Sequence, residues 1–209
     1  MSEVDFDGAV AWLADGGLVA YPTETVWGLA ADARSEPAMK ALRDFKRRDD
    51  GAPISILTTG LPALLPLGFG VGAPARRLAA AFWPGPLTLV IGCTGVFAPG
   101  VARGDGAVGV RCTPHLLAAR LAAACEAEGV GPVTATSCNA SGAPAARTRG
   151  EARSVCGADP RVRLLVGEPD AGEAPPSTVV DVSVPAPIVL RWGALGEAEL
   201  APWLEETVA

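Results

Sequence analysis

Short apolar runs alternate with stretches of helical periodicity along this chain, and that alternation constrains the fold most. The run at 18–21, Leu-Val-Ala-Tyr, predicts a buried strand that ends where Pro22 removes a backbone donor. Ser35 is placed to cap a helix that continues to Phe45. Further strands are predicted at 53–57, 87–91, 108–110, 132–136, 162–166, 178–182 and 188–190. Helices are predicted near 4–13, 35–45, 74–82, 115–127, 148–155 and 197–206.

The order of these elements predicts an α/β fold. Strands and helices alternate, and several strands follow closely late in the chain, which favours a twisted mixed sheet flanked by helices over a doubly wound one. A chain of 209 residues with 49% hydrophobic residues suits one domain, 1–209, with a full core. The segment 167–176 is rich in glycine, proline and acids, and is predicted to be a mobile loop.

Bulk properties exclude several classes of protein. No apolar run approaches the roughly 20 residues that a membrane span needs, and the acidic start is unlike a signal peptide. The five cysteines include no C-x-x-C pair, so neither a disulfide framework nor a zinc site is expected. Reduced, mostly buried thiols in a cytoplasmic protein are the simpler interpretation. A net charge of −6 disfavours nucleic acid as a tightly held partner.

The first segment with chemical potential follows the strand at 18–21. After Pro22 come Thr23, Glu24 and Thr25, which supply two hydroxyl groups and a carboxylate, and then an aromatic residue and a glycine. Loops at strand ends are where α/β proteins place ligands. An ordinary turn with a helix cap is the alternative that the residues alone leave open.

The second segment carries Lys46 and Arg48, two residues apart between a helix and a strand. In extended backbone this spacing points both charges the same way. A lysine offers a point charge, and an arginine offers a planar fork suited to phosphate or carboxylate. A solvated basic helix end is the alternative.

The third segment, 134–142, is a cluster of small polar residues after a predicted strand. Ser137 and Asn139 offer a hydroxyl and an amide, and their small neighbours let a ligand approach the backbone. A turn of this kind can present N–H groups to an anion. A polar turn without a ligand remains the alternative.

Together these segments resemble the motifs of the YrdC-like family, in particular its TsaC-type members. The family's opening motif, its K-x-R pair and its S-x-N motif match the three segments in order. Other matches are Phe-Trp-Pro-Gly-Pro-Leu-Thr at 82–88, Val-Gly-Val-Arg at 108–111, Pro-Ser-Thr-Val-Val-Asp at 176–181 and Leu-Arg at 190–191. The resemblance covers about residues 8–195, and it implies a single YrdC-like domain with a concave substrate cleft.

The resemblance also implies an activity. Family members combine L-threonine, bicarbonate and ATP into threonylcarbamoyl-adenylate and pyrophosphate, an intermediate of threonylcarbamoyladenosine modification of tRNA. ATP is a substrate with Mg²⁺, and no prosthetic group or protein-held metal is implied. Downstream threonylcarbamoyl-transferase proteins are expected partners. Binding to tRNA is expected to be weak at most, and no membrane association is expected. The resemblance implies Lys46 and Arg48 as catalytic cations. The implied ATP contacts are Lys46, Arg48, Ser137, Asn139 and Arg191. The implied threonine contacts are Thr23, Arg111, Ala135 and Ser177.

Some positions depart from the family pattern or carry no role in it. Ala52 and Trp192 replace an asparagine and a proline that are common there, and Leu57 replaces a histidine that contacts threonine in many longer members. These departures bear on substrate selectivity more than on fold. His115 is interpreted as a capping or packing residue, and Cys138 as a small buried thiol.

Two alternative functions stay open. A paralogue could adenylate the carbamate of another amine, and the changes at Leu57 and Ala52 leave room for that. An RNA-binding module is the second alternative, if its basic residues converge on one face. Without the resemblance, Arg111 and Arg191 would be interpreted as members of ion pairs. The basic residues that an RNA surface would use are Lys46, Arg47, Arg48, Arg76, Arg77, Arg147 and Arg149.

Overall fold

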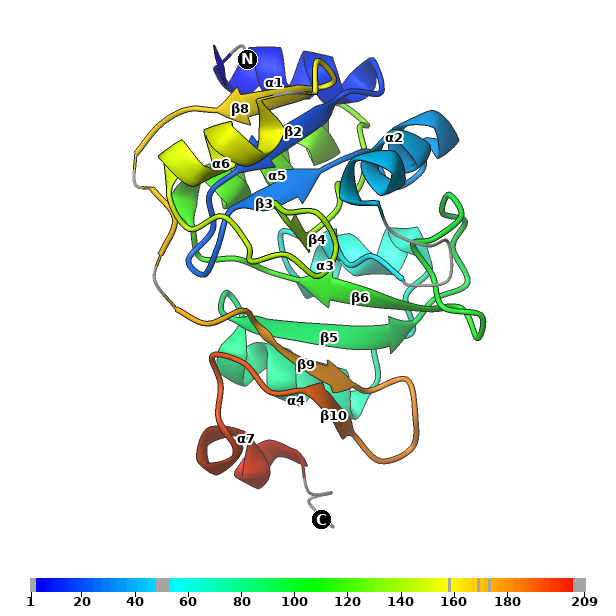
Figure 1. Ribbon diagram of the computed structural model, residues 1–209. Helices are drawn as coiled ribbons and strands as arrows, with labels where there is room; N and C mark the ends of the chain where they lie inside the picture. Colours follow the sequence, from blue (N-terminus) through cyan, green and yellow to red (C-terminus); the bar gives the residue numbers. More distant parts are fainter. Residues whose placement is uncertain (1–2, 48–52, 158, 169, 173, 205–209) are drawn as a thin grey trace.

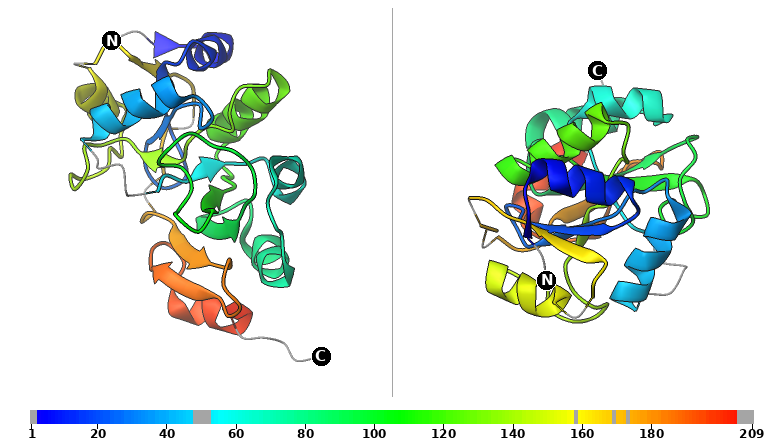
Figure 2. Two further views of the ribbon diagram at one scale, coloured as in Figure 1. Left: turned by 90° about the vertical axis from the view of Figure 1, so that its right-hand side faces the viewer. Right: turned by 90° about the horizontal axis from the view of Figure 1, so that it is seen from above.

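The computed structural model describes residues 3–47, 53–157, 159–168, 170–172 and 174–204, and its strands form two sheets (Figure 1). The first sheet has the strand order β1-β8-β2-β3-β7, and the second has the order β10-β9-β5-β6-β4. Both sheets mix parallel and antiparallel neighbours. Figures 1 and 2 show the first sheet and its helices at one end of the molecule, and the second sheet with α4 and α7 at the other.

Each sheet collects strands from distant parts of the chain. The first sheet consists of β1 (Glu3–Val4), β2 (Leu18–Tyr21), β3 (Gly28–Ala30), β7 (Thr136–Ser137) and β8 (Val162–Leu165). The second consists of β4 (Ile56–Leu57), β5 (Leu87–Gly92), β6 (Ala107–Arg111), β9 (Thr178–Asp181) and β10 (Ile188–Arg191). Every residue of β2, β3 and β6 is buried, which explains their continuous apolar or small-residue sequences.

The helices cover both faces of the first sheet. One face packs against α1 (Phe6–Ala14) and α5 (Leu116–Ala127), and the other packs against α2 (Glu36–Lys46) and α6 (Arg149–Cys156). Local signals start these helices. The side chain of Ser35 accepts a hydrogen bond from the Ala38 backbone N–H, and Thr148 and Glu151 form a capping box.

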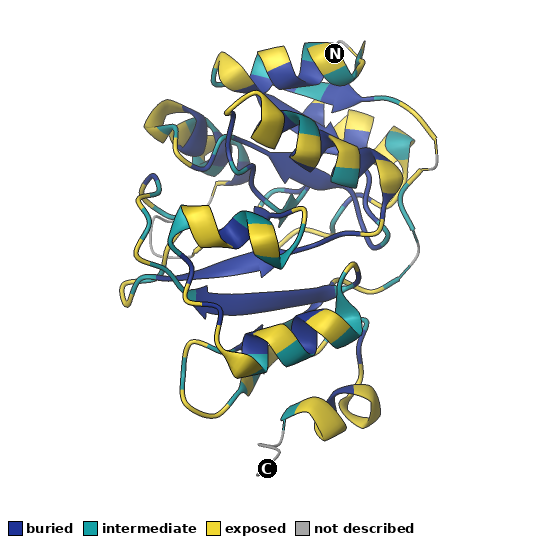
Figure 3. Cartoon of the chain, turned by 180° about the vertical axis from the view of Figure 1, so that it is seen from behind, coloured by how far each residue is buried: buried dark blue, intermediate teal, exposed yellow. Residues whose placement is uncertain are grey.

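The second sheet is covered by helices on one face only. Leu87, Leu89 and Ile91 of β5 belong to the same core cluster as Leu78 of α4 (Ala73–Phe82). The chain adds α3 (Leu61–Leu64), the 3₁₀ turn η1 (Leu65–Leu67) and α7 (Glu197–Leu204), which packs beside α4. Figure 3 shows buried strands and helices that expose their outer faces. None of the described helices is long and apolar enough to cross a membrane.

The α/β class and the helical cover are confirmed, and three details differ from the sequence prediction. The strands divide between two sheets, where one sheet was predicted. The predicted strand at 132–136 consists mostly of isolated bridges, Val133 with Asp32 and Thr134 with Ile56, and the regular pairing of β7 starts only at Thr136. Of the predicted strand at 53–57, only Ile56 and Leu57 form a ladder. The strands β1 and β3 and the helical turns at 61–67 were not predicted.

Candidate active site

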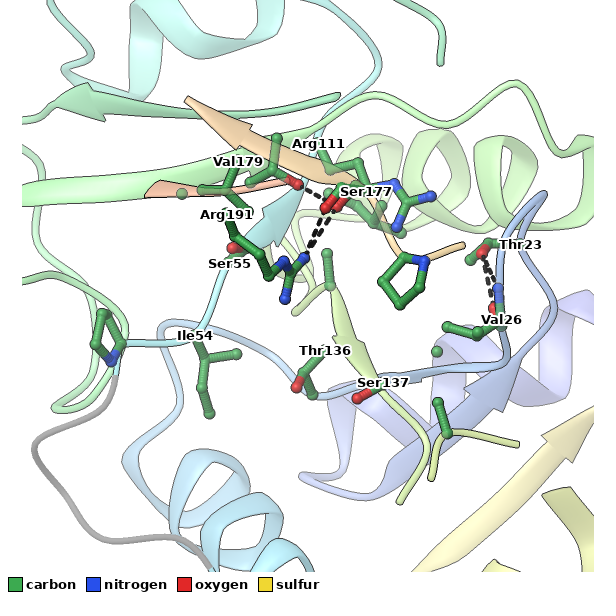
Figure 4. Close-up of a pocket in the computed structure, with 18 of the residues that line it drawn as sticks. Thr23, Val26, Ile54, Ser55, Arg111, Thr136, Ser137, Ser177, Val179 and Arg191 are labelled. Carbon is green, nitrogen blue, oxygen red and sulfur yellow. Dashed lines mark hydrogen bonds between the residues drawn. The ribbon is translucent and has the colours of Figure 1, made fainter. Parts of the chain in front are cut away.

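A cavity of about 470 Å³ lies between the uncovered face of the second sheet and one edge of the first sheet. Figure 4 shows side chains from both sheets and from the loops between them pointing into it. The cavity is large enough for a ligand of nucleotide size, since small-molecule sites are typically about 300–1,000 Å³.

One cross-strand row of the second sheet forms the floor of this cavity. Leu57 pairs with Arg111, Arg111 with Thr88, Thr88 with Val179, and Val179 with Arg191 across a β-bulge. Residues directly opposite one another on neighbouring strands face the same side of a sheet. All five line the cavity, and the row therefore holds two guanidinium groups over one surface.

A shorter row of the first sheet forms the opposite wall. Tyr21 pairs with Gly28, and Gly28 pairs with Ser137. A Cβ atom at Gly28 would lie 2.6 Å from Cζ of Tyr21, so only glycine lets the phenol ring cross this strand. The Tyr21 hydroxyl donates to the carbonyl of Thr134 at 3.1 Å. Burial raises the pKa of the Tyr21 phenol well above its ordinary value, so the phenol is neutral.

Arg111 is buried, and part of its hydrogen-bonding capacity is unused. Its Nη2 atom donates to Oε1 of Glu24 at 2.7 Å and to Oγ1 of Thr25 at 2.8 Å. Thr113 donates to the other oxygen of the Glu24 carboxylate. The Nε atom of Arg111 is buried without a partner among the described residues. A buried donor of this kind is costly unless a ligand oxygen accepts from it, and a carboxylate matches the geometry of a guanidinium.

Arg191 lies at the other end of the row and is the more exposed of the two arginines. Its Nη2 atom donates to the Ser177 carbonyl at 2.8 Å, and Figure 4 shows both guanidinium groups near Ser177. Partial burial and the positive charge of Arg111 both lower the pKa of Arg191. The Ser177 hydroxyl shares a hydrogen bond of 2.8 Å with the Thr88 hydroxyl. Two like charges held over one surface favour an anionic ligand between them.

The turn that contains Ser137 and Asn139 is held from behind by Lys46, which is only 2% exposed. Its Nζ atom donates to the Ser137 carbonyl at 2.5 Å, to the Asn139 carbonyl at 3.1 Å and to Oδ1 of Asn139 at 2.9 Å. The Ser137 hydroxyl also donates to Oδ1 of Asn139 at 2.6 Å. Lys46 therefore positions the turn here, and its side chain is not among those that line the cavity.

The hydroxyl of Thr23 forms most of the hydrogen bonds within its own turn. Its hydroxyl donates to the Val26 carbonyl at 2.7 Å and accepts from the backbone N–H groups of Thr25 and Val26. The turn is also tied to the 167–176 loop, since Gly172 N–H donates to the Thr23 carbonyl at 2.9 Å. In the same loop, Asp170 accepts from the indole of Trp27 at 2.8 Å. Through Asp170 and Gly172, the described part of this loop supports the cavity wall.

The cysteines and the histidine lie away from the cavity lining. Four thiols are buried, Cys93 is half-buried, and all five are free. The Sγ atoms of Cys138 and Cys156 are 3.1 Å apart, and hydrogen bonding between them together with burial raises the pKa of Cys156. The full burial of Cys138 agrees with its interpretation as a small buried thiol. His115 precedes α5 and makes no capping bond through its side chain, and its Nε2 atom lies 3.2 Å from the Asp170 carbonyl. His115 therefore does not cap α5 through its side chain, and packing stays the prediction for it.

Comparison with known proteins gives this geometry a context. The profile of the Sua5_yciO_yrdC family, described as "Telomere recombination", matches residues 11–193. The chain belongs to the Sua5/YciO/YrdC family. A Mycobacterium leprae relative is 39% identical over 197 residues, 92% of this chain and 84% of that protein. A Xanthomonas campestris protein named threonylcarbamoyl-AMP synthase is 40% identical over 148 residues, which cover 69% of this chain and 76% of that protein.

Solved structures of the family share the fold. Sua5 of Pyrococcus abyssi, crystallised with L-threonine, superposes with a TM-score of 0.84 at 32% identity, over 95% of this chain and 57% of that one. This chain therefore spans less than two thirds of that Sua5 chain. YciO of E. coli superposes with a TM-score of 0.75 at 23% identity, over 92% of this chain and 90% of that one, which shows the fold alone.

The structure brings together most of the residues singled out from the sequence. The cavity is lined by Thr23, Arg111, Ala135, Ser137, Asn139, Ser177 and Arg191. Lys46 is turned into the protein behind the S-x-N turn, and Arg48 lies outside the described residues, as does Ala52. Leu57 lines the cavity, whereas Trp192 is 49% exposed and is not part of the lining. The assigned roles of these residues remain proposals.

Sequence reasoning missed several residues of the site. Glu24, Thr88 and Tyr21 all lie in segments that were recognised, but none was assigned a role. Their places in the site depend on strand register and on their proximity to Arg111, and the sequence shows neither the register nor that proximity. Arg103 was missed altogether, because it lies in a loop without a motif. It lines the cavity and forms ion pairs with Asp105 and Asp181, and the hydrogen bond to Asp105 raises the pKa of Arg103.

Proposed function

We propose that this chain is a threonylcarbamoyl-AMP synthase, which makes L-threonylcarbamoyl-adenylate and pyrophosphate from L-threonine, bicarbonate and ATP. The observation that carries the proposal is the pair Arg111 and Arg191 on one row of the floor, opposite the Ser137–Asn139 turn. Membership of the family and the names of the relatives support the same activity. Residues 1–209 would act as one domain.

The carboxylate of threonine would bind Arg111. Its buried Nε atom has no partner among the described residues, and Glu24 and Thr25 hold Nη2 in place. Because two hydrogen bonds, one of them to the Glu24 carboxylate, fix the fork, little side-chain entropy is lost when the ligand binds. Thr23, Ala135 and Ser177 would contact the remaining parts of the amino acid.

ATP would bind between Arg191 and the S-x-N turn, with Ser137 and Asn139 as hydrogen-bonding groups. Mg²⁺ would accompany ATP as the counterion of its phosphates, where it neutralises developing charge. The described residues bring together no group of three or more His, Cys, Asp or Glu side chains that could hold a metal ion.

The reaction needs positioning and charge, and no covalent nucleophile. The threonine amine and bicarbonate give a carbamate and water. A carbamate oxygen then attacks the α-phosphorus of ATP, the bond to the bridging oxygen breaks, and pyrophosphate leaves with the electron pair. Arg191, with Arg48 as the further proposed cation, would stabilise the negative charge on the phosphoryl oxygens and the leaving group. Lys46, which the resemblance implied as a catalytic cation, would instead act by holding the S-x-N turn in place. The cavity would supply most of the catalysis by holding the two reactants in line.

The adenylate would be consumed by a threonylcarbamoyl-transferase that acts on tRNA, and the enzyme would work in the cytoplasm. A direct RNA-binding role finds less support. Of the basic residues that such a surface would use, Lys46 is 2% exposed and donates to the S-x-N turn, and Arg48 lies outside the described residues.

The test is ATP-dependent pyrophosphate release from the purified chain, with and without L-threonine and bicarbonate, and a mass measurement of the product. We expect release that requires both co-substrates, and a product with the mass of threonylcarbamoyl-adenylate. Folded protein that binds ATP but releases no pyrophosphate with threonine would contradict the proposal. A panel of other amines would then test the paralogue alternative.

A further inference from the structure

Two buried thiols meet behind the S-x-N turn. Cys138 lies between Ser137 and Asn139, and Cys156 is the last residue of α6. Both cysteines are 0% exposed, and their Sγ atoms are 3.1 Å apart although the residues are 18 positions apart in the sequence. Both thiols are free in this structure. The contact is made by the fold, and no local motif in the sequence indicates it.

The turn has a cavity side and a core side. Ser137 and Asn139 line the cavity, whereas Cys138 belongs to the hydrophobic core cluster that also contains Cys156. The backbone N–H of Cys138 donates to the Trp27 carbonyl at 2.8 Å, which fixes the middle of the turn against the start of β3. A displacement of Cys138 would therefore move both of its neighbours in the proposed nucleotide site.

Cys156 is held by a separate element. Helix α6 begins at the capping box of Thr148 and Glu151, and it packs against β8. A disulfide bond is about 2.05 Å long, so the two sulfur atoms would have to approach each other by about 1 Å. Because the turn and the helix are each anchored, the bond would pull them toward one another.

We propose that Cys138 and Cys156 are a site of reversible oxidation by peroxides, and that their disulfide displaces the S-x-N turn and slows turnover. One oxygen of hydrogen peroxide is transferred to the first thiol, giving a sulfenic acid, and the other leaves as water. The second thiol then attacks the sulfenic sulfur, the S–O bond breaks, and a second water leaves. Two thiols and one peroxide thus give one disulfide and two waters.

Burial controls the first step of this reaction, and sulfur contact controls the second. Hydrogen bonding to Cys138 and burial raise the pKa of Cys156, so this thiol stays protonated at neutral pH and reacts slowly. Both sulfurs are closed off from solvent, so the peroxide enters through a local opening of the turn or of α6. Once a sulfenic acid has formed, the other sulfur is already in contact, and proximity favours the disulfide over further oxidation.

The slow first step agrees with the free thiols of this structure. Disulfides in reducing compartments are usually transient and redox-sensing, and they do not serve as a permanent framework. We expect this disulfide to form over minutes to hours of sustained exposure to peroxide. Its effect on turnover comes from the displacement of Ser137 and Asn139, since a misplacement of about 1 Å in a site can cost about 10²-fold.

The experiment treats the reduced chain with hydrogen peroxide for several hours, and then measures intact mass, peptide masses and pyrophosphate release. We expect the loss of two hydrogen atoms, a peptide pair joined through Cys138 and Cys156, and pyrophosphate release lowered by at least about tenfold. Dithiothreitol should restore both mass and activity, because a disulfide can be reduced, whereas sulfinic and sulfonic acids cannot.

Two variants locate the effect. The double variant Cys138→Ala with Cys156→Ala removes both sulfurs without burying a new polar group, and peroxide should leave its activity at the value of its own reduced form. Cys93→Ala removes the half-buried thiol, and this variant should respond to peroxide as the unmodified chain does. The masses and the reversal by dithiothreitol, measured on the unmodified chain, decide the proposal if the double variant does not fold.

The outcomes keep this inference apart from the proposed function. Absence of a peptide pair joined through Cys138 and Cys156 would overturn the site, and a joined pair with unchanged pyrophosphate release would overturn its effect on the turn. If the reduced chain releases no pyrophosphate, the synthase proposal fails, and calorimetric ATP affinities of the reduced and oxidised chains decide the inference. Binding weakened by at least about tenfold after oxidation supports it. Equal affinities, or no ATP binding in either state, overturn it.

Discussion

The two walls of the cavity use their polar groups in opposite ways. On the floor, Arg111 keeps a buried Nε atom without a partner among the described residues, and Arg191 reaches the cavity from an edge strand. On the opposite wall, the hydroxyls of Tyr21, Thr23 and Ser137 all donate within the protein. The floor therefore offers charge to a ligand, whereas the opposite wall uses its hydrogen bonds to keep its own shape.

This difference assigns separate tasks to the two sheets. Charged groups that must reach a ligand stand on a continuous ladder, where strand pairing fixes their spacing. Groups that must present backbone and amide atoms stand on a turn, and a turn needs support from outside. Lys46 supplies that support from α2, with Nζ bonds to the carbonyls of Ser137 and Asn139. Substitutions on the floor should therefore impair ligand binding, whereas substitutions on the opposite wall should impair the positioning of the turn.

The largest effect is expected on the floor. Arg111→Ala should lower kcat/KM for threonine by about 10³-fold, because truncating one partner of a buried, hydrogen-bonded charge pair, here the proposed pair with the threonine carboxylate, costs about 2–5 kcal/mol. Arg111→Lys keeps the charge but not the fork, and should recover only part of the loss. Steady-state kinetics and calorimetric titration with threonine check this. A threonine affinity unchanged in Arg111→Ala would remove Arg111 from the carboxylate site.

Lys46 tests the opposite wall. Lys46→Ala should lower turnover by about 10²-fold, because a misplacement of the S-x-N turn by about 1 Å is enough for a loss of that size. Threonine affinity should stay within about threefold of its original value, since Arg111 stands on the other wall. Single-turnover kinetics and threonine titration separate the two quantities.

The matched control for that substitution is Lys40→Ala on the same helix. Lys40 is exposed and pairs with Asp44 four residues on, and solvent screens this surface ion pair so that it contributes little. Turnover should not change in this variant. If Lys46→Ala instead lost threonine affinity and turnover equally, the separation of tasks between the walls would be wrong.

The sequence predicted the residues of the site better than their arrangement. Four of the site residues lie in short motifs within strands or directly beside them, and such motifs can be recognised from the local sequence alone. They are Arg111, Ser137, Ser177 and Arg191. The row that joins Leu57, Arg111 and Thr88 depends on register between strands more than 20 residues apart, and no local pattern encodes it. The inward turn of Lys46 was missed for a similar reason, because its acceptors are carbonyls of a segment about 90 residues away.

Arg191 should show a smaller effect than Arg111, because it is more exposed and stands at an edge strand. Arg191→Ala should raise KM for ATP by roughly 10- to 30-fold, in line with about 1.5–2 kcal/mol for a charge-assisted hydrogen bond. Threonine affinity in the absence of nucleotide should not change. Initial rates over a range of ATP concentrations measure this. A loss confined to threonine would show that the two arginines share one ligand group.

The smallest effect is expected from Tyr21→Phe, which removes one hydrogen bond from the wall that keeps its own shape. The loss of the bond to the Thr134 carbonyl should lower the free energy of unfolding by about 1 kcal/mol, and turnover should stay within about threefold. Since the phenol has no proton to offer a ligand, a loss of turnover beyond about 10²-fold would give Tyr21 a direct role in the chemistry.

The pH dependence of stability gives a second test of Tyr21. Any phenolate absorbance must come from this residue, because Tyr21 is the chain's single tyrosine. Burial raises its folded-state pKa above the unfolded value of about 10, so the neutral phenol stabilises the fold fully below that pH. As pH rises past about 10, the unfolded chain loses the phenol proton while the folded chain keeps it, and stability falls. Phenolate absorbance should therefore appear only with unfolding, and Tyr21→Phe should lose less stability over that alkaline range than the unmodified protein. Phenolate absorbance from folded protein near pH 10 would show that water reaches this wall, and that its hydroxyls are open to a ligand after all.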